Sequence, residues 1–269
     1  MQPSDFSPYF EHLEIPEYKP FSFADVIIER QSKTQYIPGQ LARLHANLGG
    51  IKKDVIDNNQ DWVFQICGEV GSGKSTLALQ VAMFLDPKFD MSTQMIWDMP
   101  DWARFVRVYK DHPFKVMMFD EAVSVLFSRD GSQGTNIDLI KWLTKARASN
   151  YFIIFVIPNP WSLDLKVREE RSKTMLYVYK NVDQKNQRRY YAWYNSGALA
   201  TIAQKENDGK KILRNPKKFL NTFKPSYIPE AFPRLEASVE KEYLKYKKTD
   251  LNTFEDILIK KYTSKTIKK

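Results

Sequence analysis

A short glycine-rich segment offers the clearest chemistry in the chain. Residues 68–75 read Gly-Glu-Val-Gly-Ser-Gly-Lys-Ser and match the pattern G-x-x-x-x-G-K-S. Backbone N–H groups can wrap a phosphate closely only along a path that glycine permits. The lysine and the serine that end the pattern suit the phosphates and the Mg²⁺ ion of a nucleoside triphosphate. The segment therefore predicts a phosphate-binding loop, with a purely structural glycine turn as the alternative.

Each residue of this loop has a predicted part. Lys74 is expected to reach the β- and γ-phosphates as a catalytic residue, the Ser75 hydroxyl to bind Mg²⁺, and Thr76 to lie near the α-phosphate. A helix that starts near Lys74 adds the positive end of its dipole. ATP and Mg²⁺ are the cofactors that this set implies. The predicted nucleotide-binding residues are Gly68, Glu69, Val70, Gly71, Ser72, Gly73, Lys74, Ser75 and Thr76.

An acidic pair follows a second apolar segment. Residues 115–119 are mostly apolar and lead directly into Asp120 and Glu121. They predict a buried strand that delivers two carboxylates to the edge of a sheet where ligands bind in open α/β folds. We expect Asp120 to hold Mg²⁺ through water, and Glu121 to polarise the attacking water. Many strands end in acidic residues, so the pair alone is a weak indication of a site. Its position after the phosphate loop is what makes it specific.

A third polar position follows the most apolar segment of the chain, residues 151–157. Asn159 lies two residues beyond it, between Pro158 and Pro160. We predict that Asn159 senses the γ-phosphate and belongs to the catalytic set. The alternative is an ordinary turn asparagine before a proline.

A ring ATPase also needs a positive charge, supplied by the neighbouring subunit, to stabilise the transition state. Arg147 is the preferred candidate, because it ends the helix that precedes residues 151–157. Arg171 is the second choice, and Arg168 and Arg129 are further candidates. For each of them, a solvated or ion-paired arginine is the alternative.

These residues require a sheet to position them. Repeated strand–helix units predict a mainly parallel sheet with helices on both faces. A further strand, residues 189–194, is expected to form a hairpin with residues 174–179. The predicted strands are residues 62–67, 94–97, 115–119, 151–157 and 174–179, and the predicted helices are residues 74–85, 101–110, 136–149 and 163–171.

Two flanking segments complete the predicted organisation. Residues 1–58 comprise an extended arm over residues 1–38 and a helix over residues 40–57, and residues 59–204 form the core. Residues 205–269 form a basic linker and a helical tail. Because every nucleotide motif lies upstream, a chain that ends near Gln204 is expected to keep its fold and its basal hydrolysis.

Composition narrows the class of protein. The 269 residues carry a net charge of +9, and residues 205–269 hold 17 of the 41 basic residues against 9 of the 32 acidic ones. This excess favours a polyanionic partner, with a solubilising tail as the alternative. The single cysteine, Cys67, cannot form an intrachain disulfide and favours an intracellular, cytoplasmic location. We expect no signal peptide, no membrane segment and no His/Cys metal site.

The order of these features resembles the additional-strand, catalytic-glutamate class of P-loop ATPases. Within that class, residues 143–179 and the aromatic strand at residues 189–194 resemble the FtsK/HerA-type DNA pumps, which include viral genome-packaging ATPases and Zot-like proteins of phages and mobile elements. The resemblance covers roughly residues 60–195. Many of those pumps carry glutamine where this chain has Asn159.

The resemblance implies a RecA-like three-layer α/β fold and a homo-oligomer, often a hexameric ring, that threads double-stranded DNA without sequence preference. The leading hypothesis is an ATP-driven motor that translocates or packages DNA for a virus or a mobile element, in the host cytoplasm or associated with the virion. A P-loop kinase or other phosphotransferase is the first alternative, although Glu121 and the basic tail argue against it. A non-translocating ATP-dependent switch or loader is the second.

Overall fold

The computed structural model describes residues 41–121, 134–180, 188–204 and 216–266. All of them belong to one unit of the chain, Gln40–Lys269. The predicted arm at residues 1–38 and the candidate Arg129 lie outside the described residues.

Seven strands of the described residues form one sheet in the order β2-β3-β4-β1-β5-β6-β7. The first five strands in this order are parallel, and β6 and β7 add an antiparallel edge. The prediction of a mainly parallel α/β sheet is therefore confirmed, and so is the hairpin between β5 and β6. The strands are β1 (Trp62–Gly68), β2 (Met95–Ile96), β3 (Val116–Phe119), β4 (Phe152–Ile157), β5 (Ser172–Lys180), β6 (Arg189–Asn195) and β7 (Glu230–Ala231).

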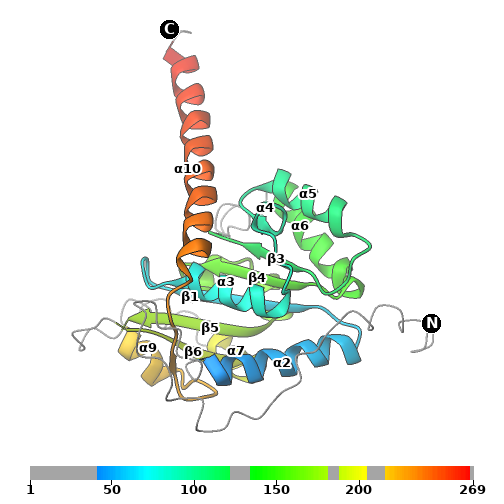
Figure 1. The fold of residues 1–269 in the computed structure, drawn as a ribbon, viewed down its shortest axis with the longest axis vertical. Coiled ribbons are helices and arrows are strands. Elements are labelled where there is room, and N and C mark those ends of the chain that lie inside the picture. Colours follow the sequence, from blue (N-terminus) through cyan, green and yellow to red (C-terminus); the bar gives the residue numbers. More distant parts are fainter. Residues whose placement is uncertain (1–40, 122–133, 181–187, 205–215, 267–269) are drawn as a thin grey trace. The chain divides into compact units, whose positions relative to one another are not determined.

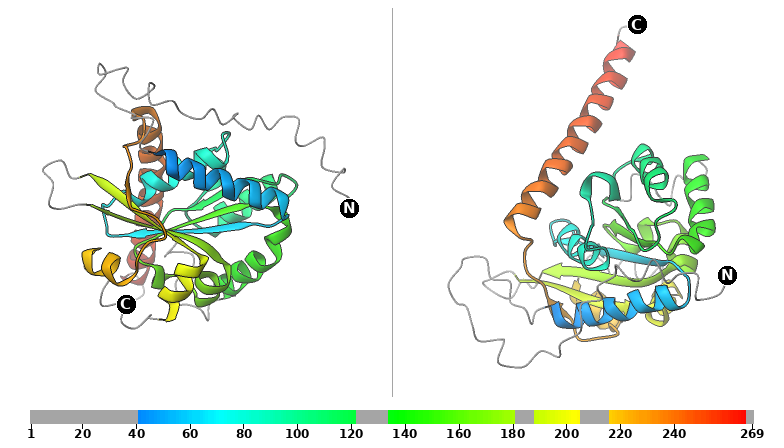
Figure 2. Two further views of the ribbon diagram at one scale, coloured as in Figure 1. Left: turned by 90° about the horizontal axis from the view of Figure 1, so that it is seen from below. Right: turned by 45° about the vertical axis from the view of Figure 1, so that its right-hand side comes forward.

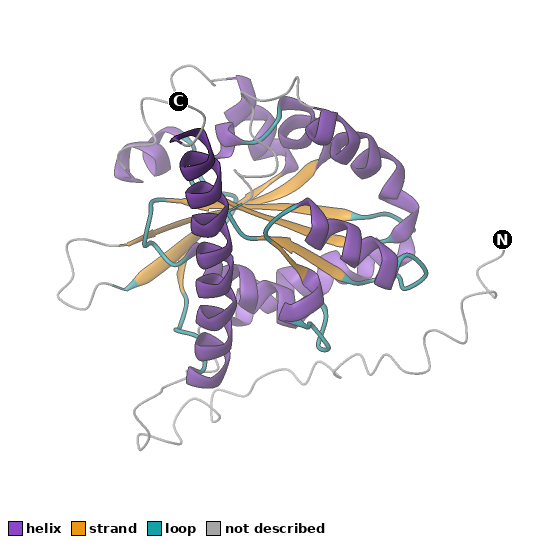
Figure 3. Ribbon diagram, turned by 90° about the horizontal axis from the view of Figure 1, so that it is seen from above, coloured by secondary structure: helices purple, strands orange, loops and turns teal. Residues whose placement is uncertain are grey.

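The central strands are buried on both faces, which explains their nearly continuous apolar sequences. On β4, Phe152, Ile154 and Val156 join one core cluster. Ile153 and Phe155 join the other, as the two-residue period of a strand requires. Figure 3 shows helices on both sides of the strands.

Helices cover the two faces in separate groups. In the left panel of Figure 2, α2 lies on one side of the sheet, and α6, α7 and α9 lie on the other. The first core cluster takes its helical members from α2, α3, α4 and α10, and the second takes them mainly from α5, α6, α7 and α9. This arrangement gives the three layers of the predicted fold. The helices are α2 (Ala42–Asp57), α3 (Lys74–Leu85), α4 (Met91–Gln94), α5 (Met99–Tyr109), α6 (Gly134–Lys145), α7 (Ser196–Gln204), α9 (Pro216–Thr222) and α10 (Ala237–Thr266).

The segment after Gln204 contributes to the core. Phe219 of α9 stacks on Tyr177 with ring centroids 4.4 Å apart, and the Tyr194 hydroxyl donates to the Phe223 carbonyl oxygen at 2.8 Å. Farther along, β7 pairs with β6, and Phe232, Leu235 and Tyr243 enter the opposite core cluster. Five buried hydrophobic side chains of the described residues therefore lie downstream of Gln204, and this packing argues against the expectation that a chain ending there keeps its fold.

Helix α10 begins against the sheet and then leaves it (Figure 1). Tyr243 in its second turn is buried, whereas Leu251 and Phe254 are more than half exposed. No helix in the part of the chain that the structure describes combines the length and the apolar character needed to cross a lipid bilayer.

Candidate nucleotide-binding site

The loop between β1 and α3 needs its glycines for identifiable reasons. Gly68, Gly71 and Gly73 have φ angles of +147°, +73° and +102°, a region that disfavours other residues. A Cβ atom on Gly68 would lie 2.0 Å from the carbonyl oxygen of Val178 on β5. The loop is thus wedged between a strand and the N-terminus of a helix, where free N–H groups and the helix dipole favour an anion.

Lys74 folds back over this loop. Its ammonium donates to the carbonyl oxygens of Gly68 at 3.0 Å and Glu69 at 2.9 Å. Burial lowers the pKa of Lys74, while the nearby Asp120 and Glu121 oppose that shift. The carbonyl oxygens that hold this ammonium are neutral. A negatively charged phosphate bound at the loop would interact with the ammonium more strongly than they do and could replace them.

The two predicted magnesium ligands are in direct contact. The Ser75 hydroxyl donates to Oδ1 of Asp120 at 2.9 Å, and Asp120 is 1% exposed. Burial raises the pKa of Asp120, and hydrogen bonds from Tyr243 and Ser75 oppose the shift. Hard oxygen atoms from a hydroxyl and a carboxylate are the donors that Mg²⁺ prefers, so this pair fits the ion.

The loop after β1, the start of α3 and the contact between Ser75 of α3 and Asp120 after β3 lie at one edge of the sheet. The fold is that of a P-loop NTPase. No protein-family model matches the chain, and no curated protein matches it either.

Three solved structures illustrate the similarity in fold. The N-terminal domain of zonular occludens toxin from Neisseria meningitidis has a TM-score of 0.41 and 14% identity, covering 66% of this chain and 96% of that one. The genome-packaging NTPase B204 from Sulfolobus turreted icosahedral virus 2 has a TM-score of 0.37 and 12% identity, covering 53% and 95%. The AAA domain of FIGL-1 has 0.36 and 15%, covering 87% and 97%.

The first two of these are of kinds that the sequence resemblance names. Similarities of this size carry no argument about function. The assignment of the P-loop fold rests on the loop, the strand order and the Ser75–Asp120 contact of this chain.

Glu121 lies next to Asp120 in an unusual backbone conformation. Its φ of +55° lies in the left-handed region, which costs a non-glycine residue roughly 1–3 kcal/mol and is frequent at functional sites. Its carboxylate accepts a hydrogen bond from the Lys247 ammonium at 2.8 Å. The residue is therefore held at the edge of the predicted magnesium site.

Asn159 lies just beyond β4, which separates β1 from β3. The Gly68 amide donates to the Pro158 carbonyl oxygen at 3.3 Å, so this turn adjoins the phosphate loop. The topology thus places Asn159 between the loop and the acidic pair. Its role as a phosphate sensor stays a prediction.

The arginines separate into two kinds. Arg147 is exposed in the turn Ala146–Ser149, before β4 starts. It therefore lies toward the amino edge of the sheet, opposite the phosphate loop. Arg171 is buried, forms an ion pair with Asp61 and donates to the Leu143 carbonyl oxygen at 2.8 Å. Arg168 is also buried and pairs with Glu169. Of these three, Arg147 is exposed, whereas Arg168 and Arg171 are buried.

Three site residues were absent from the sequence prediction. Arg189 of β6 donates to the Thr76 hydroxyl at 3.3 Å and packs against Gly73. Tyr243 and Lys247 of α10 reach Asp120 and Glu121. Their spacing of four residues places Tyr243 and Lys247 on one helix face, but nothing in the sequence says which partner that face meets.

Proposed function

We propose that the chain hydrolyses ATP at this sheet edge and uses the energy to translocate or package DNA. The Ser75–Asp120 contact, with Glu121 next in the chain and Lys74 on the loop, is the observation that carries the ATPase part of the proposal. A kinase transfers the phosphate to an acceptor group and needs no carboxylate that polarises water. Glu121 therefore favours hydrolysis over phosphate transfer.

The residues divide the chemistry among themselves. The loop N–H groups and Lys74 would bind the β- and γ-phosphates, and Ser75 and Asp120 would hold Mg²⁺. The ion, when bound, neutralises the charge that develops on the phosphate oxygens. Glu121 would accept a proton from the attacking water. The water oxygen would then bond to the γ-phosphorus as the bond from that phosphorus to the ADP oxygen breaks. Asn159 would hold a γ-phosphate oxygen.

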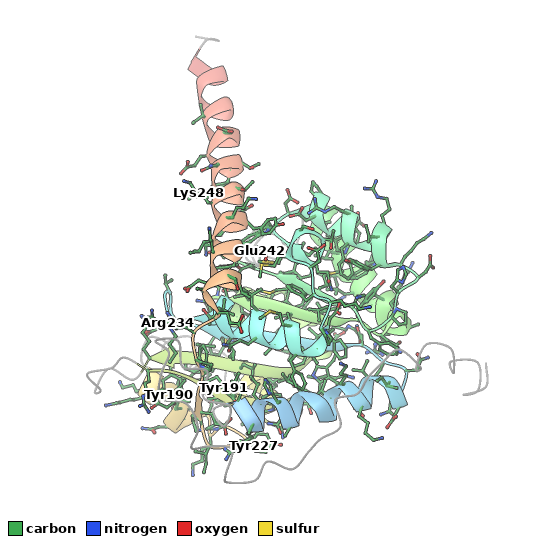
Figure 4. All side chains as sticks on the ribbon, in the orientation of Figure 1. Tyr190, Tyr191, Tyr227, Arg234, Glu242 and Lys248 are labelled. Carbon is green, nitrogen blue, oxygen red and sulfur yellow. The ribbon has the colours of Figure 1, made fainter. Side chains whose placement is uncertain are left out.

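Charge supports DNA as the partner. The excess of basic residues lies after residue 204, and Lys241, Lys245 and Lys248 are exposed on α10 (Figure 4 labels Lys248). Lysines that contact phosphates bind nucleic acid without sequence preference, which suits a motor that must pass over any sequence. The exposed Leu244, Leu251 and Phe254 on the same helix support a contact between subunits as the second use of α10.

Assembly into a ring is part of the same proposal. An exposed Arg147 on the edge away from its own phosphate loop would complete the site of a neighbouring subunit. A cytoplasmic location, in a host cell if the source is viral, also belongs to the proposal and rests on the single buried cysteine.

The test is ATP turnover with and without double-stranded DNA, with Lys74→Ala as the inactive control. Turnover that rises with DNA of any sequence, and particle size that grows with an ATP analogue and DNA, supports a motor. Binding of ATP without turnover would instead indicate a switch or loader. Transfer of phosphate to an acceptor other than water would indicate a phosphotransferase.

A further inference from the structure

Helix α10 reaches back to the predicted magnesium site from the far end of the chain. The Tyr243 hydroxyl donates to Oδ2 of Asp120 at 2.8 Å, across 123 residues of sequence. The other oxygen of the same carboxylate, Oδ1, accepts from Ser75 at 2.9 Å. Each oxygen of Asp120 therefore has its own hydroxyl donor, and the two donors come from different elements.

The Tyr243 side chain packs in the hydrophobic core. The residue is 8% exposed and belongs to the same cluster as Leu235 and Met95. Its ring stacks on Trp97 with centroids 6.5 Å apart. The phenol is the donor in this hydrogen bond, because a carboxylate only accepts. A packed ring of this kind holds its hydroxyl at one position.

Solvent exposure distinguishes the Tyr243–Asp120 contact from the neighbouring Lys247–Glu121 contact. A hydrogen bond from a buried hydroxyl to a buried carboxylate is strong, because no water competes for it. The Lys247–Glu121 ion pair has side chains 41% and 68% exposed, and solvent-exposed pairs of this kind contribute little. The contact that fixes the position of α10 at the site is therefore Tyr243–Asp120, and the lysine pair follows from it.

We propose that Tyr243 is a positioning residue of the magnesium site, which holds Oδ2 of Asp120 so that Oδ1 faces Ser75. The inference rests on the proposed ATPase function and makes α10 a part of the nucleotide site. Without the phenol the buried carboxylate is free to rotate away from Ser75. Residues that orient a ligand in this way typically change metal affinity or activity by about 10–100-fold.

Tyr243→Phe tests the proposal, because it removes the hydroxyl and keeps the ring that packs on Trp97. The matched control is Tyr246→Phe on the same helix, which is packed against the same cluster. Binding of a fluorescent, non-hydrolysable ATP analogue is measured as a function of Mg²⁺ concentration in the full-length chain. We expect Tyr243→Phe to raise the Mg²⁺ concentration for half-maximal binding by about 10-fold or more. We expect Tyr246→Phe to leave it unchanged.

A double-mutant cycle tests whether Tyr243 acts through Asp120. In an Asp120→Asn background, Tyr243→Phe should add nothing to the Mg²⁺ requirement, because the two changes remove one interaction. Additive effects, or a wild-type Mg²⁺ requirement in Tyr243→Phe while Asp120→Asn raises it, would overturn the inference and leave the ATPase proposal intact. If Asp120→Asn itself left Mg²⁺ dependence unchanged, the proposed function would fail instead. Thermal unfolding of each variant shows that the comparison is made on folded protein.

Discussion

Lys74 turns back onto its own loop, where the carbonyl oxygens of Gly68 and Glu69 hold its ammonium. It is the loop's own cation for the β- and γ-phosphates. We therefore expect Lys74→Ala to abolish hydrolysis and to weaken ATP binding, measured by phosphate release and by nucleotide titration. Lys88→Ala, a change at an exposed lysine beyond the end of α3, should leave both unchanged. Hydrolysis at the wild-type rate in Lys74→Ala would remove the phosphate-loop assignment.

Glu121 carries the second prediction at this scale. Glu121→Gln keeps the shape of the side chain and removes its ability to accept a proton. ATP binding should persist while turnover falls by at least ~100-fold, the scale of a positioned base. Single-turnover kinetics with bound ATP separate the two steps. If Asp120→Asn alone stopped hydrolysis and Glu121→Gln did not, the roles of the two carboxylates would be assigned wrongly.

The sequence predicts site residues well where a local pattern carries the chemistry. The serine–aspartate contact follows from a loop before a helix and an acidic pair after a strand, and both patterns are local. Tyr243 has no such pattern, since a tyrosine among lysines is equally typical of a solvated helix. The partner that defines its part in the site lies 123 residues away. The ion pair of Arg171 could not be predicted from the sequence either. Its partner Asp61 comes close only because β1 packs beside β5.

Gly68 allows strand β5 to pass close to the phosphate loop. Gly68→Ala should destabilise the fold by at least ~2 kcal/mol, since its Cβ would lie 2.0 Å from the Val178 carbonyl oxygen at a φ of +147°. Gly49→Ala is the control: a Cβ there meets nothing within 4 Å, in the middle of α2. That change should stabilise by about 0.5–1 kcal/mol. Denaturant unfolding measures both, and equal effects would contradict the close approach.

Prediction of the elements succeeded where the phosphate-loop pattern or a periodic run of apolar residues marked them. Helix α3 has the predicted bounds, and α2 lies within the helix predicted at residues 40–57 and buries Leu44, Leu48, Ile51 and Val55 on one face. The helix predicted at residues 163–171 is present as a short helix over residues 165–171, which is π-helical at Val167–Arg171. Side chains bind at both ends of this short helix: Asp164 accepts from the Lys166 amide at its start, and Ser172 donates to the Val167 carbonyl oxygen at its end. Helix α9 and strand β7 lie within the predicted linker.

A chain that ends at Gln204 provides an element-scale test. It lacks five buried side chains, each worth about 1.5–3 kcal/mol, a sum close to the whole stability of a typical domain. We expect such a chain to lose cooperative thermal unfolding. A chain that ends at Asp250 keeps these residues and should unfold as the full chain does. The five side chains are Phe219, Phe223, Phe232, Leu235 and Tyr243. A cooperative transition in the shorter chain would contradict their place in the core.

At the scale of the assembly, Arg147 and Arg171 lead to opposite expectations. Arg147→Ala should fold normally and lose hydrolysis, and mixing it with Lys74→Ala should restore part of the activity, because one interface then pairs an intact loop with an intact arginine. Arg171→Ala should instead unfold about 3–5 kcal/mol more easily, since it leaves Asp61 buried without its partner. Phosphate release by mixed subunits and thermal unfolding of each variant provide the two readings. No rescue by Arg147→Ala would mean that this arginine does not act between subunits.

The hydrogen bond between Asp120 and Tyr243 also has a consequence for synthesis of the protein. A ribosome that adds 5–20 residues per second needs about 6–25 s to pass from one of these residues to the other. During that interval the nascent chain already carries its phosphate loop and both carboxylates, yet it lacks the tyrosine that orients one of them. The proposed magnesium site therefore has all of its residues only after the first turns of α10 have been made.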